Sequence, residues 1–136
     1  MKGSYLLLIK LNNTARISVG KKGKKEFQKG LYVYTGSALN GLEQRIQRHL
    51  RKNKKNHWHI DYLLQQASIV AIYYKIGENR DECNFAQILD KKLLSIPDFG
   101  CTDCNCYSHL FFGNKKEIFT VINCLKMKRY PINTNY

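Results

Sequence analysis

The chain has 136 residues, a length typical of one domain, and its 43% hydrophobic content excludes a disordered chain. It carries 23 Lys and Arg against 10 Asp and Glu, so the formal net charge of +13 excludes an acidic tail and makes a polyanion the first partner to consider. The longest apolar stretches, residues 6–9 and 69–74, are too short to span a membrane, and the N-terminus lacks a signal peptide's apolar segment. We therefore expect a cytoplasmic protein that does not act in a membrane.

Runs of apolar and aromatic residues bounded by turn residues predict the strands of a compact α/β domain. The predicted strands are residues 4–11, 15–20, 30–34 (ending at Gly36), 69–76 and a short edge strand at 110–112. Asn12 and Asn13 are typical turn residues, so we expect the first two strands to form a hairpin, with residues 21–25 as the next turn.

Apolar residues at helical spacing predict helices between these strands. The predicted helices are residues 37–52, 57–66, 80–95 and 115–126. Ser37 is the expected N-cap of the first helix. The polar residues from 128 onward predict a frayed end. The sequence thus indicates one domain over residues 1–127 and a C-terminal tail over residues 128–136.

The positive charge is concentrated in two segments, one around Gly23 and one between Glu43 and Asp61, where the chain has no acid. In the second segment the cations alternate with histidines and Trp58, a combination that suits a phosphate backbone with nearby bases. The candidate DNA-binding residues are Lys21, Lys22, Lys24, Lys25, Arg48, Arg51, Lys52, Lys54 and Lys55. The alternative interpretation is a lysine-rich face that only keeps the protein soluble.

The five cysteines all fall in the second half of the sequence, and an odd number in a cytoplasmic protein argues against a disulfide framework. Cys101, Cys104, Cys106 and His109 form the pattern C-x2-C-x-C-x2-H, in which the C-x2-C step is a common zinc spacing. A structural zinc ion is therefore one candidate cofactor. The alternative is a loop of reduced, partly buried thiols, since cytosolic cysteines commonly behave as small hydrophobic residues.

Five side chains on the predicted elements form a candidate catalytic set. Tyr5 lies in the first strand and Tyr34 in the third, so their phenols approach one another if the strands are neighbours. Arg45 and His49 are four residues apart and share a helix face, and Glu82 lies on the apolar face of its helix. Each residue alone has a structural explanation, such as packing in a strand or favouring a helix dipole. Together they suit phosphodiester hydrolysis, in which the carboxylate holds a divalent metal.

The tripeptides Gly3-Ser4-Tyr5 and Tyr34-Thr35-Gly36 resemble the two half-motifs of the GIY-YIG nuclease superfamily. The resemblance continues in order with Arg45, His49 and Glu82. Within that superfamily the chain most resembles the DUF123 group, over residues 3 to about 112. The segments that carry this narrower resemblance are residues 29–39, 45–50, 57–63 (HWHIDYL), 81–83, 99–106 (FGCTDCNC) and 108–111.

The resemblance implies an α+β fold with a small, mainly antiparallel central sheet flanked by helices, and metal-dependent cleavage of DNA, branched or damaged forms included. Tyr5 or Tyr34 would deprotonate or position the attacking water, and Arg45 would contact the scissile phosphate. His49 would be a second proton-transfer group, and Glu82 would hold Mg²⁺ or Mn²⁺. The chain has Ser4 and Thr35 where the motif name has Ile, and we expect both to point away from the site.

Three functional interpretations follow. The first is a divalent-metal-dependent endonuclease that hydrolyses DNA phosphodiester bonds. The second is a nucleic-acid-binding module without turnover. The third is a metal-stabilised interaction domain in which the cysteine loop is the functional part. Because every chargeable position of the catalytic set is present, the sequence favours the first interpretation over the second.

Overall fold

The computed structural model describes residues 2–20, 23–38, 40–52, 54–77, 81–97, 99 and 108–132, with the backbone alone of Glu82. Within these residues six antiparallel strands form one sheet in the order β6-β7-β4-β1-β5-β8. The strands are β1 (Gly3–Leu11), β4 (Gly30–Ala38), β5 (Ser68–Ile76), β6 (Leu94–Ser95), β7 (Leu110–Gly113) and β8 (Lys128–Tyr130). A separate hairpin pairs β2 (Ala15–Ser18) with β3 (Lys24–Phe27).

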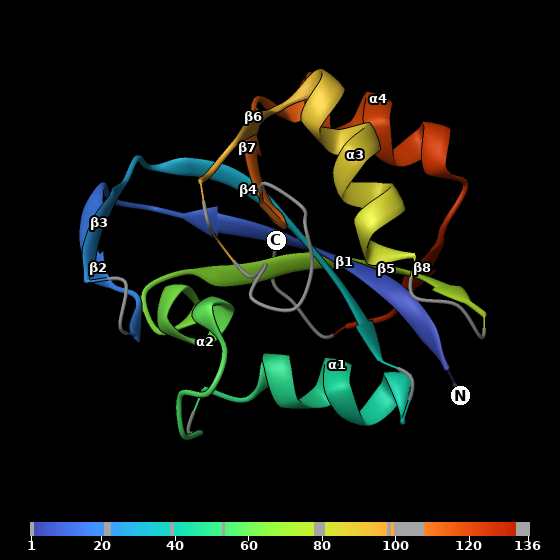
Figure 1. The fold of residues 1–136 in the computed structure, drawn as a ribbon, viewed down its shortest axis with the longest axis horizontal. Coiled ribbons are helices and arrows are strands. Elements are labelled where there is room, and N and C mark those ends of the chain that lie inside the picture. The colour runs from blue at the N-terminus through green and yellow to red at the C-terminus, as the bar shows by residue number, and fades with distance from the viewer. Residues whose placement is uncertain are drawn as a thin grey trace.

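Helices cover both faces of this sheet (Figure 1). They are α1 (Leu42–Leu50), α2 (His59–Leu64), α3 (Glu82–Lys92) and α4 (Lys115–Leu125). Helices α1 and α2 lie on one face, and α3 and α4 lie on the other (Figure 1). The expected α+β fold with an antiparallel central sheet is therefore confirmed. In the part of the chain that is described, no helix is long and apolar enough to cross a bilayer.

The central strand β1 divides the hydrophobic core into two layers. Its odd-numbered residues, such as Tyr5 and Leu7, pack with α1 and α2, whereas Leu6 and Leu8 pack with α3 and α4. Successive side chains of a strand point to opposite faces, so a strand covered on both faces needs apolar residues at nearly every position. This explains the unbroken apolar run that the sequence shows at this strand.

The end of β4 differs from the prediction. Ser37 is not the N-cap of a helix, because β4 continues to Ala38 and pairs Ser37 with Ser4 of β1. The two hydroxyl oxygens are 2.9 Å apart, which satisfies both side chains within the sheet. Helix α1 begins at Leu42 after Gly41, whose φ of 146° suits glycine alone. Sequence periodicity placed the helix start too early because Ser37 is a good N-cap residue in isolation.

The predicted hairpin between the first two strands is also wrong. Strand β1 is already paired with β4 on one edge and with β5 on the other, so it has no free edge for β2. Strand β2 pairs with β3 instead, and Ile17, Val19 and Phe27 of this hairpin pack into the core on the α1/α2 side. Lys24 and Lys25, predicted in a turn, are therefore strand residues.

The predicted frayed tail begins with an ordered strand. Residues of β8 pair with β5 at the edge of the sheet, and the Tyr130 ring lies 6.2 Å from that of Tyr74. Gln47 of α1 donates a hydrogen bond of 2.9 Å to the Tyr130 hydroxyl. The short run of polar residues concealed this strand because an edge strand exposes much of its surface to water.

The two glycine-containing half-motifs fit together at the centre of the sheet. Tyr5 lies opposite Gly36 in the ladder between β1 and β4. A Cβ at Gly36 would lie 2.5 Å from the Tyr5 hydroxyl oxygen, and a Cβ at Gly3 would lie 2.6 Å from the carbonyl oxygen of Lys75. Both positions therefore require glycine for close approach, and Gly36 allows the Tyr5 phenol to lie across β4.

A Gly36→Ala substitution should displace the Tyr5 ring and lower the free energy of unfolding by about 1–3 kcal/mol, the usual cost of overpacking. The matched control is Gly77→Ala, since a Cβ there meets no atom of the described residues within 4 Å, and we expect a change within about 0.5 kcal/mol. Urea denaturation of both variants measures the difference. Equal stability of the two variants would contradict the proposed packing of Tyr5 on Gly36.

Candidate active site

Tyr5 and His49 form a buried hydrogen-bonded pair beneath α1. The Tyr5 hydroxyl oxygen is 2.7 Å from His49 Nε2, and the two ring centroids are 5.4 Å apart. Tyr5 is 1% exposed and His49 2%. The pair joins the central strand to the last turn of α1.

The environment of His49 keeps its imidazole neutral. Burial, together with the nearby ammonium group of Lys54, lowers the pKa of His49 to about 3. Among the described residues, no hydrogen-bond partner meets its buried Nδ1 atom. At neutral pH the ring therefore orients the Tyr5 hydroxyl through Nε2. A group with so low a pKa binds a proton weakly, so it is a poor general base in the protein as it stands.

Tyr34 lies on the same face of the sheet, one strand away from Tyr5. Its ring centroid is 6.2 Å from that of His49 and 6.3 Å from that of Phe99, both in edge-to-face geometry. At 8% exposure, Tyr34 is the more accessible of the two motif tyrosines. Tyr32 shares this face, as a regular strand requires, but its hydroxyl donates to the carbonyl of Gln28 and burial raises its pKa to about 12. Tyr32 is therefore a packing residue.

The Arg45 guanidinium lies near the buried Tyr5–His49 pair and is held in place by two neighbours. Arg45 Nη1 donates a 3.2 Å hydrogen bond to the carbonyl of Ser37, and its Cζ atom is 4.4 Å from the centroid of the Trp58 ring. The Trp58 ring is in turn 5.9 Å from the His49 ring. Because Arg45 is only partly buried, its remaining N–H groups can meet an anion from solvent.

Asp61 fixes the position of Trp58. Arg48 donates two hydrogen bonds of 2.9 Å to the Asp61 carboxylate, and the backbone N–H groups of His57 and Trp58 donate to its Oδ2 atom. Asp61 is 0% exposed. Burial alone would raise the pKa of Asp61, but these donors hold it below the usual value. The Cζ atom of Arg48 lies 4.3 Å from the Trp58 ring centroid, so the indole contacts two arginines.

The start of α3 lies beside the same strand ends. The backbone N–H of Asp81 donates to Ser4 Oγ, which bonds Ser37 Oγ, and Ser37 also accepts the bond from Arg45. Helix α3 therefore begins at Glu82 next to the β1–β4 ends that hold Arg45. The side chain of Glu82 lies outside the described structure. Ser4 points to the α3/α4 face of the sheet, away from Tyr34, but toward the start of the helix that carries Glu82.

A magnesium or manganese site at Glu82 is compatible with this position. Among the described residues no three His, Cys, Asp or Glu side chains converge as a metal-binding group. Mg²⁺ does not need such a group, since it commonly keeps several waters and uses one or two carboxylates together with substrate phosphates. Glu82 is the first residue of α3, so a site of this kind would need only one protein carboxylate there.

The predicted DNA-binding residues have different roles in the structure. Lys52 donates to the carbonyls of Leu64 and Ala67, and burial lowers its pKa, so it supports the fold. Lys24 is exposed, whereas Lys25 donates to the carbonyl of Pro97. Lys21 and Lys22 lie outside the described residues. The remaining predicted cations are Arg48, Arg51, Lys54 and Lys55, which line one pocket.

The predicted zinc ligands Cys101, Cys104 and Cys106 also lie outside the described residues. His109, the fourth, is buried at the start of β7, and its backbone bonds both Phe99 and Thr35. Its Nε2 atom is 3.9 Å from Cys83 Sγ, so a thiol from α3 lies beside the histidine of the cysteine pattern. This contact involves a cysteine that the linear pattern did not include.

The structure thus brings together Tyr5, Tyr34, Arg45 and His49 of the predicted catalytic set. Sequence reasoning missed Trp58 and Asp61 as the residues that hold Arg45 in place. The signal was present, since Asp61 is the first acid after a long basic segment and Trp58 lies among its cations. An ion pair between Asp61 and one of these cations could be expected. Only the fold shows that the Asp61 carboxylate is buried and that the Trp58 indole contacts two arginines.

The low pKa of His49 predicts a specific loss of stability in mild acid. The unfolded chain takes up a proton at this histidine near pH 6.5, whereas the folded chain does not until about pH 3. The free energy of unfolding should therefore fall by up to about 1.4 kcal/mol per pH unit as the pH drops below 6.5. A His49→Gln variant, whose amide nitrogen can take the place of Nε2, should lack this contribution.

Urea denaturation of the wild type and the variant between pH 7 and pH 5 measures this difference. NMR of the His49 ring in the wild type gives an independent check and should show a neutral imidazole at pH 5. A charged His49 ring at pH 5, or the same pH dependence in both proteins, would contradict the assignment.

Comparison with known proteins gives one match. The family model described as "Domain of unknown function DUF123" matches residues 4–129. No curated protein and no solved structure matches the chain. The matched range runs from the first half-motif in β1 through the tyrosine–histidine pair and into β8. Because the match covers most of the chain, the protein belongs to the DUF123 family.

Proposed function

We propose that this protein is a divalent-metal-dependent endonuclease that hydrolyses DNA phosphodiester bonds, with the active-site plan of the GIY-YIG nucleases. The observation that carries the proposal is the convergence of both half-motifs on one arginine-bearing helix. Tyr5 bonds His49, Tyr34 packs against the same imidazole, and Arg45 lies one indole ring away. Residues from three separate segments of the chain therefore meet at one place.

The arginine suits the charge that develops during hydrolysis. A phosphoryl group gains negative charge on its oxygens in the transition state, and a guanidinium already held in position stabilises that charge without further ordering. Arg45 is held by the carbonyl of Ser37 and the ring of Trp58, is partly exposed to solvent, and has N–H groups that bond no other described residue. We assign it to the scissile phosphate.

The two tyrosines differ in what they can do. Tyr34 is the more accessible phenol, and we assign it to positioning the attacking water and accepting its proton. A phenol has a pKa of about 10 and needs neighbouring positive charge to act as a base. The Tyr5 phenol is buried between Gly36 and His49. We assign it a structural role, which is to hold the His49 imidazole in place.

Glu82 is the proposed ligand of Mg²⁺ or Mn²⁺. A cation bound there would offset charge on the phosphate oxygens and favour ionisation of water. The protein's own part is to present one carboxylate at the start of α3, beside the strand ends that position Arg45.

A nicking assay tests the proposal directly. Supercoiled plasmid and branched DNA substrates should be cut with Mg²⁺ or Mn²⁺ and left intact with EDTA. Arg45→Ala should lower the cleavage rate by about 10²–10³-fold, the usual effect of removing one donor to a developing oxyanion. Arg129→Ala is the matched control, because Arg129 is exposed on β8 opposite Tyr73, away from the α1/α2 face. Binding of DNA without metal-dependent cleavage would favour a binding module instead.

The tyrosine assignment gives a second test. Tyr34→Phe removes the proposed proton acceptor and should lower the cleavage rate at least about tenfold. Its DNA affinity, measured with EDTA present, should change little because the ring remains. Tyr32→Phe is the control, since it loses a bond to Gln28 at a cost of about 1 kcal/mol in stability and should cleave normally. Full cleavage by both the Tyr5→Phe and the Tyr34→Phe variants would reject this mechanism.

A further inference from the structure

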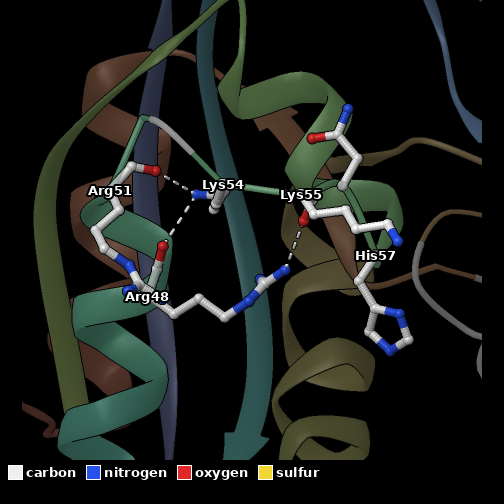
Figure 2. A pocket seen from close by; sticks show the side chains of 6 residues that line it. Arg48, Arg51, Lys54, Lys55 and His57 are labelled. Carbon is white, nitrogen blue, oxygen red and sulfur yellow. Dashed lines mark hydrogen bonds between the residues drawn. The ribbon is translucent and has the colours of Figure 1, made fainter.

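A basic pocket lies where α1 ends and the chain turns toward α2. Its volume is about 420 Å³, within the range of ligand-binding pockets. Four of its lining residues are cations, and Figure 2 shows them around one hollow. The basic pocket is lined by Arg48, Arg51, Lys54, Lys55, Asn56 and His57.

The positive charge of the basic pocket exceeds the negative charge available to balance it. In the described part of the chain, the one ion pair that reaches the pocket is that of Arg48 with Asp61. The Asp61 carboxylate is fully buried and already accepts from two backbone N–H groups as well. Asp61 also acts on the charge of Lys54, but among the described residues no acid forms an ion pair with Arg51 or Lys55, and an anion in the pocket would relieve the mutual repulsion of these cations.

The walls of the basic pocket are fixed before any ligand binds. The Lys54 ammonium donates to the carbonyls of Arg48 and Arg51, and Arg48 Nη2 donates to the carbonyl of Lys55 (Figure 2). The Lys54 ammonium also donates to the carbonyl of His49. These bonds cover carbonyl groups at the C-terminal end of α1 that would otherwise repel an anion. Burial and the neighbouring cations lower the pKa of Lys54 to about 8, a cost that a bound anion would offset.

The basic pocket and the proposed cleavage site share one wall. Arg48 belongs to the pocket and Arg45 to the site, and the Cζ atoms of both lie within 4.4 Å of the Trp58 ring centroid. A nucleic-acid strand whose phosphate contacts Arg45 can therefore place another phosphate in the pocket, a few ångströms along the same helix.

We propose that the basic pocket binds a phosphate monoester, supplied by the terminal phosphate of a nucleic-acid strand, so that the protein prefers strands with a phosphorylated end. The inference rests on the proposed function for its substrate but concerns binding alone. A terminal phosphate carries nearly two negative charges at neutral pH and has three oxygens that accept hydrogen bonds, whereas a backbone phosphodiester carries one charge. Arg51 and Lys55, two cations that form no ion pair among the described residues, line the hollow together with the charge of Lys54, and this arrangement suits the dianion better than a continuous backbone.

Binding experiments with EDTA present separate this inference from catalysis. Trp58 is the single tryptophan of the chain and contacts Arg48, so its fluorescence reports occupation of the pocket. Short single strands with a 5′-phosphate, a 3′-phosphate or two hydroxyl ends are compared at constant ionic strength, because backbone contacts alone depend on salt. One phosphorylated end should bind about tenfold more tightly than the hydroxyl strand, as charge-assisted hydrogen bonds add to the backbone contacts.

Variants of the pocket identify where that preference arises. Arg51→Ala and Lys55→Ala should each reduce the preference for a phosphorylated end to less than about twofold, since each removes an uncompensated cation. Lys115→Ala, an exposed residue at the start of α4 on the other face of the sheet, should leave it unchanged. Equal binding of phosphorylated and hydroxyl strands by the wild type would overturn the proposal, even if the plasmid is cleaved normally.

Small phosphates distinguish the source of the ligand. Inorganic phosphate and thymidine monophosphate should bind the basic pocket at least about tenfold more weakly than the phosphorylated strand. Unlike the strand, they make no contacts with Arg45 or with cations outside the pocket. If either binds as tightly as the strand, the pocket serves a small phosphate ligand and the strand-end proposal is wrong. Preserved preference in the Arg51→Ala/Lys55→Ala double variant would also reject it.

Discussion

The buried carboxylate of Asp61 is the interaction on which the α1/α2 face depends. It is fully enclosed, and removing a charge partner from such a site is costly because the other charge is left unpaired. Its four hydrogen bonds tie Arg48 of α1 to the backbone that opens α2. Trp58, held by this network, then fixes Arg45. One acid in a strongly basic segment therefore determines where two arginines lie.

The second constraint is the close approach of β1 and β4. Gly36 permits the Tyr5 phenol to cross β4 and reach the last turn of α1. The Ser4–Ser37 contact, one residue pair nearer the strand end, connects the other face of the sheet to the start of α3. The site is thus built at the ends of two neighbouring strands, where residues from both layers of helices meet. This arrangement explains how residues far apart in the sequence come to lie close together.

Much of the fold and of the candidate site could be predicted from local patterns. The apolar run of β1 and the four-residue spacing of Arg45 and His49 were sufficient to place these residues on a core strand and on one helix face. The pairing of β2 and the order in β8 were not predictable, because they depend on which sheet edges remain free. Ser37 misled the prediction because its N-cap propensity was outweighed by pairing with β1. The role of Trp58 depends on a buried ion pair between two helices, which no local spacing reveals.

The cations near the candidate site also affect the protonation of the His49 imidazole. Burial is the main reason that His49 stays neutral, and the cations of Lys54, Arg45 and Arg48 lower its pKa further. A phosphate bound beside these cations would offset their repulsion of a proton, whereas burial would remain. A phosphate in the basic pocket would therefore raise the pKa of His49 from its low value of about 3. In the proposed mechanism, binding of a phosphate would therefore be coupled to the protonation of His49 through the same three side chains.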